Sequence, residues 1–264
     1  MELYQFRHSA FCEKVRLLLS AKQLSYRVIE VTPGIGQVEL FRLSGQRQVP
    51  VLKDGADVVA DSTTIAQFLE EAYPEPPLIP EQSGARALAL LLEDWADTSL
   101  ATGVRMALLQ AASHDPILRK ALLPSATPAP LKGLVGAMPA DLLGGVGQVF
   151  GRGSREQLLA SLEHLSQLVR EDDHLVDDVL SIADLAVAAQ LYHLKFPASA
   201  GVELRQRGVP GIVDNPLLEP LFSWRDGIYR KACRGLQEES GHRPPQSPGQ
   251  TTAGSARDPG PSAR

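Results

Sequence analysis

The chain has 264 residues, of which 44% are hydrophobic and 22% are charged, and its net charge at pH 7 is −5. This length allows one large domain or two ordinary ones. The negative net charge and the dispersed basic residues argue against a nucleic-acid partner. No run reaches the roughly 20 apolar residues of a membrane span, and a strand-like start at residue 2 argues against a signal or transit peptide. Two distant cysteines, Cys12 and Cys233, predict neither a disulfide framework nor a metal site, and they fit a reducing cytoplasm.

Residues 1 to about 80 have the pattern of a small α/β domain. A strand, an amphipathic helix and a second strand follow one another, which predicts a parallel crossover unit. After a less regular stretch, two short apolar runs flank Asp54-Gly55, which is typical of an antiparallel hairpin. A last helix begins near Ser62 and stops before Pro74. The predicted elements are strands at 2–6 and 26–31, a helix at 13–24, a hairpin at 49–60 and a helix at 62–73.

The strand signals disappear from about residue 85, so residues 85–238 are expected to form an all-helical domain. The Pro-rich segment 73–84 is interpreted as the linker between the two domains. The Gly-, Pro- and Ala-rich stretch 124–153 fits either a broken helix or a loop. Residues 239–264 lack Val, Ile, Leu, Met and aromatic residues, so we expect a disordered tail. The predicted helices are 85–112, 154–171, 182–195 and 216–235.

Four separate stretches carry a family resemblance. They are, in chain order, "SAFCEKVRLLLSAKQLSYRVIEV", "QVPVL", "ADSTTIAQFLEEAYP" and "LSIADLAVAAQL". Over residues 1–235, their order and spacing resemble the soluble glutathione S-transferase superfamily. The resemblance implies the glutathione transferase fold, an α/β thioredoxin-like N-terminal domain plus an all-α C-terminal domain. It further implies glutathione as co-substrate, a small electrophile or peroxide as second substrate, a homodimer and a cytoplasmic location.

The resemblance also implies where glutathione binds. Ser62 precedes an amphipathic helix and by itself fits an N-cap, although the positive end of that helix also suits a carboxylate. By resemblance, Ser62 receives the γ-glutamyl carboxylate and Asp61 helps to hold the α-amino group. The "QVPVL" stretch implies a cis bond between Val49 and Pro50, with the Val49 backbone pairing with the cysteinyl part. The alternative is a Pro50 that only starts an edge strand.

Two residues compete for the catalytic role. Ser9 matches the serine that, in serine-type glutathione transferases, donates a hydrogen bond to the glutathione sulfur and favours the thiolate. Thiol transferases and dehydroascorbate reductases of this superfamily carry a nucleophilic cysteine there, commonly as C-x-x-C. Here the pattern is S-x-x-C, so Cys12 takes the place of the resolving cysteine, where such a residue usually behaves as a small apolar group. The alternatives are therefore an oxidoreductase acting through Cys12 and a non-catalytic binding protein of the same fold.

Two further expectations concern the helical part. Ser181 and Asp184 fit a capping box that starts a helix and contributes to folding. The second substrate is expected between the Ser9 loop and the long helix, where Trp95, Arg105 and Met106 are candidates.

Overall fold

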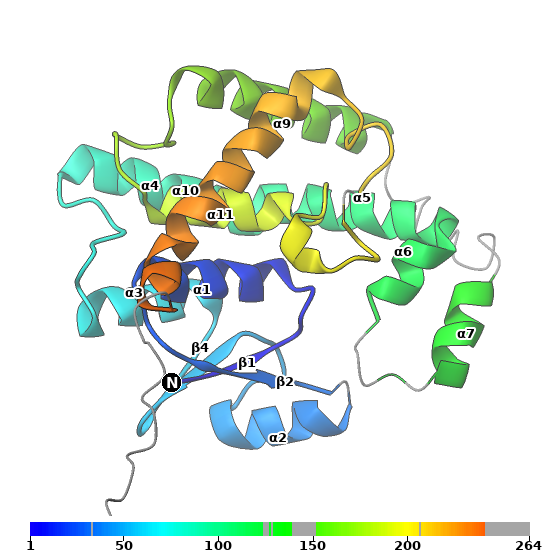
Figure 1. The fold of residues 1–264 in the computed structure, drawn as a ribbon, viewed down its shortest axis with the longest axis horizontal. Coiled ribbons are helices and arrows are strands. Elements are labelled where there is room, and N and C mark those ends of the chain that lie inside the picture. Colours follow the sequence, from blue (N-terminus) through cyan, green and yellow to red (C-terminus); the bar gives the residue numbers. More distant parts are fainter. Residues whose placement is uncertain (33, 124–126, 128, 139–151, 206, 241–264) are drawn as a thin grey trace, which may run out of the picture.

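The computed structural model describes residues 1–32, 34–123, 127, 129–138, 152–205 and 207–240. Its amino-terminal part is built on a mixed four-stranded sheet of order β2-β1-β3-β4 (Figure 1). The strand β1 pairs in parallel with β2 and antiparallel with β3, and β3 pairs antiparallel with β4. The crossover unit and the hairpin expected from the sequence are therefore confirmed. The strands are β1 (Glu2–Gln5), β2 (Arg27–Glu30), β3 (Val51–Asp54) and β4 (Asp57–Ala60).

Three helices cover this sheet on both faces. Helices α1 (Ala10–Ala21) and α3 (Ser62–Ala72) lie on one face, and α2 (Ile35–Ser44) lies on the other (Figure 1). The sequence pattern of this segment predicted a less regular stretch and no helix, and this prediction was wrong. Its apolar residues do not form one buried stripe: Ile35 is 77% exposed and Leu40 is the only buried residue of the helix. Periodicity is therefore a poor signal for this helix.

The rest of the described chain is helical. The predicted long helix is one rod with α-helical geometry at both ends, α4 (Ser83–Trp95) and α5 (Ala101–His114), and a π-helical turn at Ala96–Leu100 between them. The predicted helix at 182–195 is shorter than expected, because the turn that follows Leu191 ends it. The other helices are α6 (Pro116–Ala121), α7 (Ala129–Ala137), α9 (Arg152–Glu171), α10 (Ile182–Leu191) and α11 (Glu219–Ser240).

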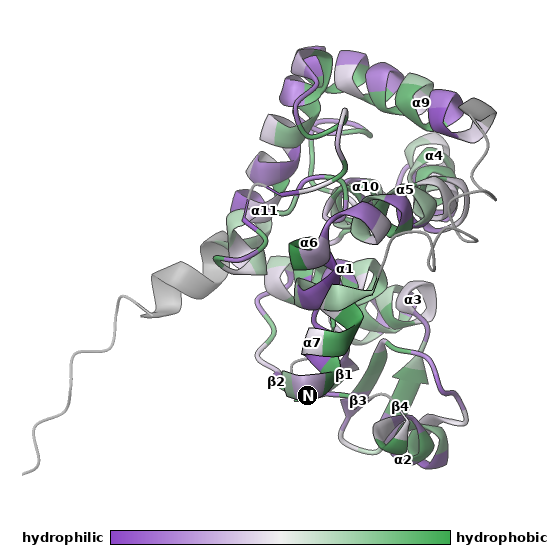
Figure 2. Cartoon of the chain, turned by 90° about the vertical axis from the view of Figure 1, so that its right-hand side faces the viewer, coloured by the Kyte–Doolittle hydropathy of each residue, from purple (hydrophilic) through white to green (hydrophobic). Residues whose placement is uncertain are grey.

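Helix α10 is the centre of the helical part, and all ten of its residues are buried. It packs against α1, α4 and α11, so it joins the helical part to the sheet part. Figure 2 shows hydrophobic colour on α10 and alternating hydrophilic and hydrophobic bands on the outer helix α9. One apolar core therefore runs from Leu3 in β1 to Ala232 in α11. A smaller cluster of Val31, Leu40 and Val51 lies between the sheet and α2.

The Pro-rich segment between the two parts is held in place. The Lys22 side chain at the end of α1 is fully buried; its ammonium donates to the carbonyls of Tyr73 and Pro76 at 2.8 and 3.0 Å and pairs with Glu70 at 2.6 Å. Further along, the Leu78 carbonyl accepts from the Ile182 N–H at 2.8 Å. The α/β part and the helical part are therefore joined by directed bonds as well as by apolar contact.

Two sequence expectations fall largely outside the described residues. Helix α11 continues to Ser240, and the remainder of the tail predicted to be disordered, 241–264, is not described. Within the stretch 124–153, α7 is described, whereas residues 139–151 are not. Across the described residues, no helix is both long enough and apolar enough to cross a membrane.

Candidate active site

The sheet register brings the predicted site positions to one edge of the sheet. Val51, the first residue of β3, lies opposite Tyr4 of β1 and Ala60 of β4. The segments that lead from β1 to Ser9, from Pro50 into β3, and from β4 to Ser62 therefore meet at this edge. The peptide bond between Val49 and Pro50 is cis, as the family resemblance implied.

Ser9 is the N-cap of α1. Its backbone is extended, and its Oγ accepts a hydrogen bond from the Cys12 N–H at 3.3 Å. A serine hydroxyl has one proton and two acceptor lone pairs. The cap uses an acceptor site only, so the O–H remains able to donate to a ligand atom in front of the helix.

The loop before Ser9 is held by the end of α10. His193 Nε2 lies 2.8 Å from the His8 carbonyl oxygen, so this nitrogen carries the proton and donates it. The Tyr192 hydroxyl lies 2.9 Å from Nδ1 of His8. Burial lowers the pKa of both histidines to about 4, so both are neutral at pH 7. The sequence analysis did not single out Tyr192 and His193. Their polar side chains at the end of an apolar helix are a signal that could have found them, but only the fold shows what they contact.

Cys12 points into the core. It is 0% exposed, and burial raises the pKa of its thiol from 9.0 to about 11, although the hydrogen bond with Ser9 opposes that shift. A nucleophilic cysteine needs access and a lowered pKa. This environment does not support the alternative in which Cys12 is the reactive centre.

The start of α3 differs from the prediction in one respect. Asp61, not Ser62, is the N-cap: its Oδ1 accepts from the N–H groups of Thr63 and Thr64 at 3.0 and 3.1 Å. Asp61 is exposed and has a φ of +78°, an unusual conformation for a residue other than glycine. Ser62 is the first helical residue, 2% exposed, and its Oγ donates to Asp97 Oδ2 at 3.3 Å. The helix therefore begins at Ser62, one residue earlier than a Ser62 cap would require, because the Asp61 carboxylate caps the N–H groups of Thr63 and Thr64.

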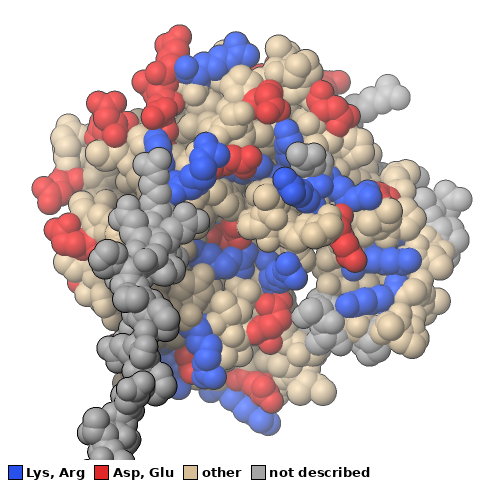
Figure 3. Space-filling view, in the orientation of Figure 1, with Lys and Arg blue, Asp and Glu red and all other residues tan. Residues whose placement is uncertain are grey.

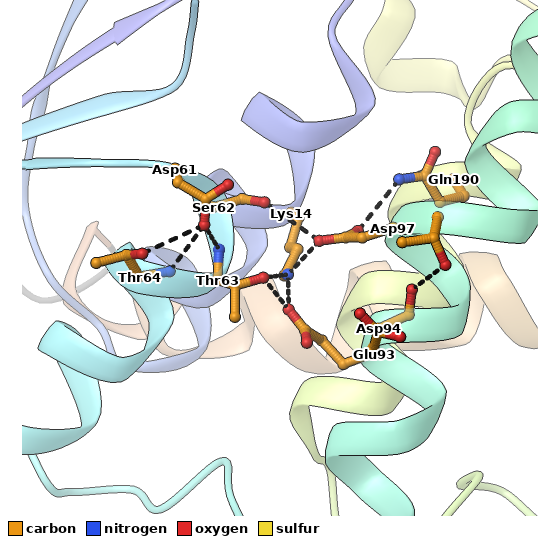
Figure 4. Close-up of polar contacts among 10 residues, drawn as sticks. Lys14, Asp61, Ser62, Thr63, Thr64, Glu93, Asp94, Asp97 and Gln190 are labelled. Carbon is orange, nitrogen blue, oxygen red and sulfur yellow. Dashed lines mark hydrogen bonds and ion pairs between the residues drawn. The ribbon is translucent and has the colours of Figure 1, made fainter. Parts of the chain in front are cut away.

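Behind Ser62 lies a buried charged cluster that periodicity did not single out (Figure 4). The ammonium of Lys14, on α1, is 0% exposed and contacts the Glu93 carboxylate and, at 2.7 Å, that of Asp97. Thr63 and Gln190 add hydrogen bonds to the two carboxylates, so the cluster ties α1 and α3 to α4, the π-helical turn and α10. Burial raises the pKa of Asp97, and Lys14 opposes that shift. One cation facing two carboxylates leaves excess negative charge directly behind the start of α3.

A cavity of about 870 Å³ has Ser9 in its wall. It lies between the loop after β1 and the helices α6 and α7, and Val202, Glu203, Arg205 and Arg207 form a further wall. Trp95 and Met106 instead line a separate groove of 730 Å³ against α9, so the expectation that they face Ser9 was wrong. The face of α4 and α5 that carries Trp95 and Met106 lies against α9 and not against the sheet.

Comparisons with known proteins agree with this architecture. Residues 3–77 match the family profile described as the glutathione S-transferase N-terminal domain. A zeta-class glutathione S-transferase of Euphorbia esula is 34% identical over 91 residues, which is 33% of this chain and 40% of that protein. A probable maleylacetoacetate isomerase of Vibrio cholerae is 37% identical over 97 residues, 33% of this chain and 45% of that protein. The chain thus matches less than half of each relative's length.

The solved structures extend the likeness to the helical part. A glutathione S-transferase from Rhodospirillum rubrum F11 superposes with a TM-score of 0.61 at 24% identity, covering 89% of this chain and 90% of that one. At this identity the likeness concerns the fold. Residues 3–77 therefore match the profile of the glutathione S-transferase N-terminal domain, and the chain as a whole has the fold seen in the glutathione S-transferase of Rhodospirillum rubrum F11.

Proposed function

We propose that the protein is a glutathione S-transferase that binds glutathione along the edge formed by Ser9, Val49-Pro50 and Asp61-Ser62. The observation that carries this proposal is the register at Val51, which brings the three segments to one sheet edge. The γ-glutamyl carboxylate meets Ser62 at the positive end of α3. Its α-amino group meets the excess negative charge of Asp61 and of the cluster around Lys14. The Val49 backbone pairs with the cysteinyl part, and the sulfur lies at Ser9.

In this proposal the hydroxyl of Ser9 donates to the glutathione sulfur. A hydrogen bond to an anion stabilises the charged form, so the thiol loses its proton more readily. The thiolate then attacks a small electrophile or reduces a peroxide. The biological role that we propose for this reaction is detoxification. The loop contacts of His193 and Tyr192 hold the backbone before Ser9, which keeps the hydroxyl at the start of α1.

Two further proposals concern the assembly and the compartment. A homodimer is supported by Leu88 and Leu91 on α4, which are 45% and 64% exposed, and by the symmetric pairing common among soluble oligomers. A cytoplasmic location is supported by the two cysteines, which are both free. No membrane or nucleic-acid partner is proposed.

Binding to immobilised glutathione tests the site. Wild type is expected to be retained and eluted by free glutathione. Ser62→Ala is expected to bind more weakly, because the Ser62 hydroxyl, which donates to Asp97 in this structure, must turn to the glutathione carboxylate on binding and the variant lacks it. Ser44→Ala, a serine on α2 whose hydroxyl bonds only within its own segment, is the matched control. Equal retention of wild type and Ser62→Ala, or no retention of wild type, contradicts the proposed site.

A further inference from the structure

The cavity beside Ser9 is strongly basic, although the chain as a whole is acidic. Its lining has five cationic and two anionic side chains, against a net charge of −5 for the protein. Figure 3 shows basic side chains gathered around the hollow beside α6 and α7. The charged lining residues are Arg7, Lys120, Lys132, Arg205 and Arg207 and, of opposite sign, Glu30 and Glu203. Cations that converge on a concave surface raise the local concentration of anions.

Some of the charged side chains in the cavity wall already interact with other groups of the protein. Arg207 pairs with Asp115 at 3.3 Å, and Glu30 accepts from the Arg7 N–H at 2.7 Å. Lys120 and Arg205 differ, because within the described part of the chain the side chain of neither has a hydrogen-bond or ion-pair partner. The two come from separate segments, the end of α6 and the loop after α10. The cavity therefore contains two cations that a bound anion can satisfy.

Apart from His8 and Ser9, the remaining lining is apolar. Phe6 and Leu122 are among six apolar residues in the wall, and the volume of 870 Å³ lies within the range of small-molecule sites. A ligand that matches both parts has an apolar body and an anionic group. The apolar residues are Phe6, Ile117, Ala121, Leu122, Leu123 and Val202.

We infer that this cavity is the second-substrate site and that it selects electrophiles bearing a carboxylate. The inference rests on the proposed function, because it takes the glutathione sulfur to lie at Ser9, in the wall of the cavity. The apolar body of the electrophile faces Phe6 and Leu122 with its reactive carbon toward Ser9. Its carboxylate lies between Lys120 and Arg205.

A matched pair of electrophiles tests the inference. With 4-chloro-3-nitrobenzoate and its methyl ester, the glutathione sulfur forms a bond to the ring carbon and chloride leaves with the electron pair of the C–Cl bond. Each kcat/KM is divided by the uncatalysed rate constant, which removes the difference in intrinsic reactivity. Wild type is expected to prefer the carboxylate, and added salt is expected to reduce this preference because salt screens exposed charges.

The variants remove charge and keep length. Lys120→Gln and Arg205→Gln are each expected to lower kcat/KM for the carboxylate about threefold, and the double variant about tenfold, as for partly screened charge pairs. The ester rate and the KM for glutathione should stay unchanged. Arg230→Gln, an exposed arginine of α11 outside the cavity, is the control and should change neither substrate.

Several results overturn the inference. Equal losses on both substrates, no loss in the double variant, or a raised KM for glutathione would show that the cavity does not select the carboxylate. If wild type conjugates neither substrate, the proposed function fails, and calorimetric binding of the benzoate tests the cavity alone. A roughly tenfold weaker affinity in the double variant then supports the anion site, whereas equal affinities reject it.

Discussion

Replacing Ser9 by alanine separates the two roles of its side chain. The cap bond to the Cys12 N–H is 3.3 Å, slightly beyond the usual range for N–H···O. Its loss should cost toward the lower end of the range for N-caps, below about 1 kcal/mol. The loss of a hydrogen bond to a charged sulfur is larger, about 1.5–3 kcal/mol. That corresponds to a roughly ten- to hundredfold fall in the rate of conjugation at pH 7.

The assay follows conjugation of an electrophile as a function of pH, together with thermal unfolding. For Ser9→Ala, the rate should recover partly toward pH 8.5, because the thiol of free glutathione ionises near that pH without help. Glutathione affinity should fall less than the rate, since the contacts at Val49 and Ser62 remain. The melting temperature should fall by no more than about 4 °C, so the variant stays folded.

Two companion variants make the test decisive. Ser9→Thr keeps both the cap and the donor, so it should retain most of the rate. Ser9→Asp keeps the cap, because its carboxylate accepts the Cys12 N–H, but it cannot donate to a thiolate and adds a negative charge beside it. It should therefore be as stable as wild type and at least as slow as Ser9→Ala. A Ser9→Asp variant with wild-type conjugation, or a Ser9→Ala variant with an unchanged pH profile, would refute the proposed role.

Four other outcomes are expected. Lys14→Met leaves two buried carboxylates unpaired and should destabilise the fold by about 3–5 kcal/mol in urea unfolding at pH 7; an unchanged midpoint contradicts this. His193, with its pKa lowered to about 4, should make the unfolding free energy fall as pH drops from about 6.5 toward 4, since the unfolded chain then binds more protons. His193→Gln, which keeps a donor, should flatten that slope, and an equal slope would count against this origin. In the native protein a thiol reagent should leave Cys12 unmodified, and Cys12→Ala should conjugate at nearly the wild-type rate. Sedimentation should give twice 28.5 kDa at micromolar concentration, and Leu91→Glu should give the monomer mass.

The sequence by itself determined the architecture of the amino-terminal part and most helices. The two short apolar runs that flank Asp54-Gly55 and the amphipathic helix between two strands are local signals, because each is contained within a few neighbouring residues of the chain. The cis bond at Pro50 was expected only through the family resemblance. The capping interaction was also correctly read: Asp184 accepts from the Ser181 N–H at 2.8 Å.

Tertiary structure alone decided which residues surround the site. The helix at 35–44 buries little apolar surface, so its pattern carried no periodic signal. A lysine on an amphipathic helix, such as Lys14, is usually exposed to solvent. Lys14 is fully buried, because two carboxylates from a segment about 80 residues later contact it there. Whether Asp61 or Ser62 caps α3 depends on the exact residue at which the helix begins. Helix propensity does not predict that boundary to within one residue.

The second-substrate cavity shows the same limit most clearly. Its wall combines the loop at Ser9 with Lys120 and Arg205, which are far apart along the chain and which no sequence motif connects. Trp95 and Met106 lie on the long helix that was expected to face the Ser9 loop, but their side chains line the groove against α9. Only one side of this helix can face the sheet. Local residue patterns record which face of an element is apolar. Only the packing of the elements determines which polar residues those faces bring together.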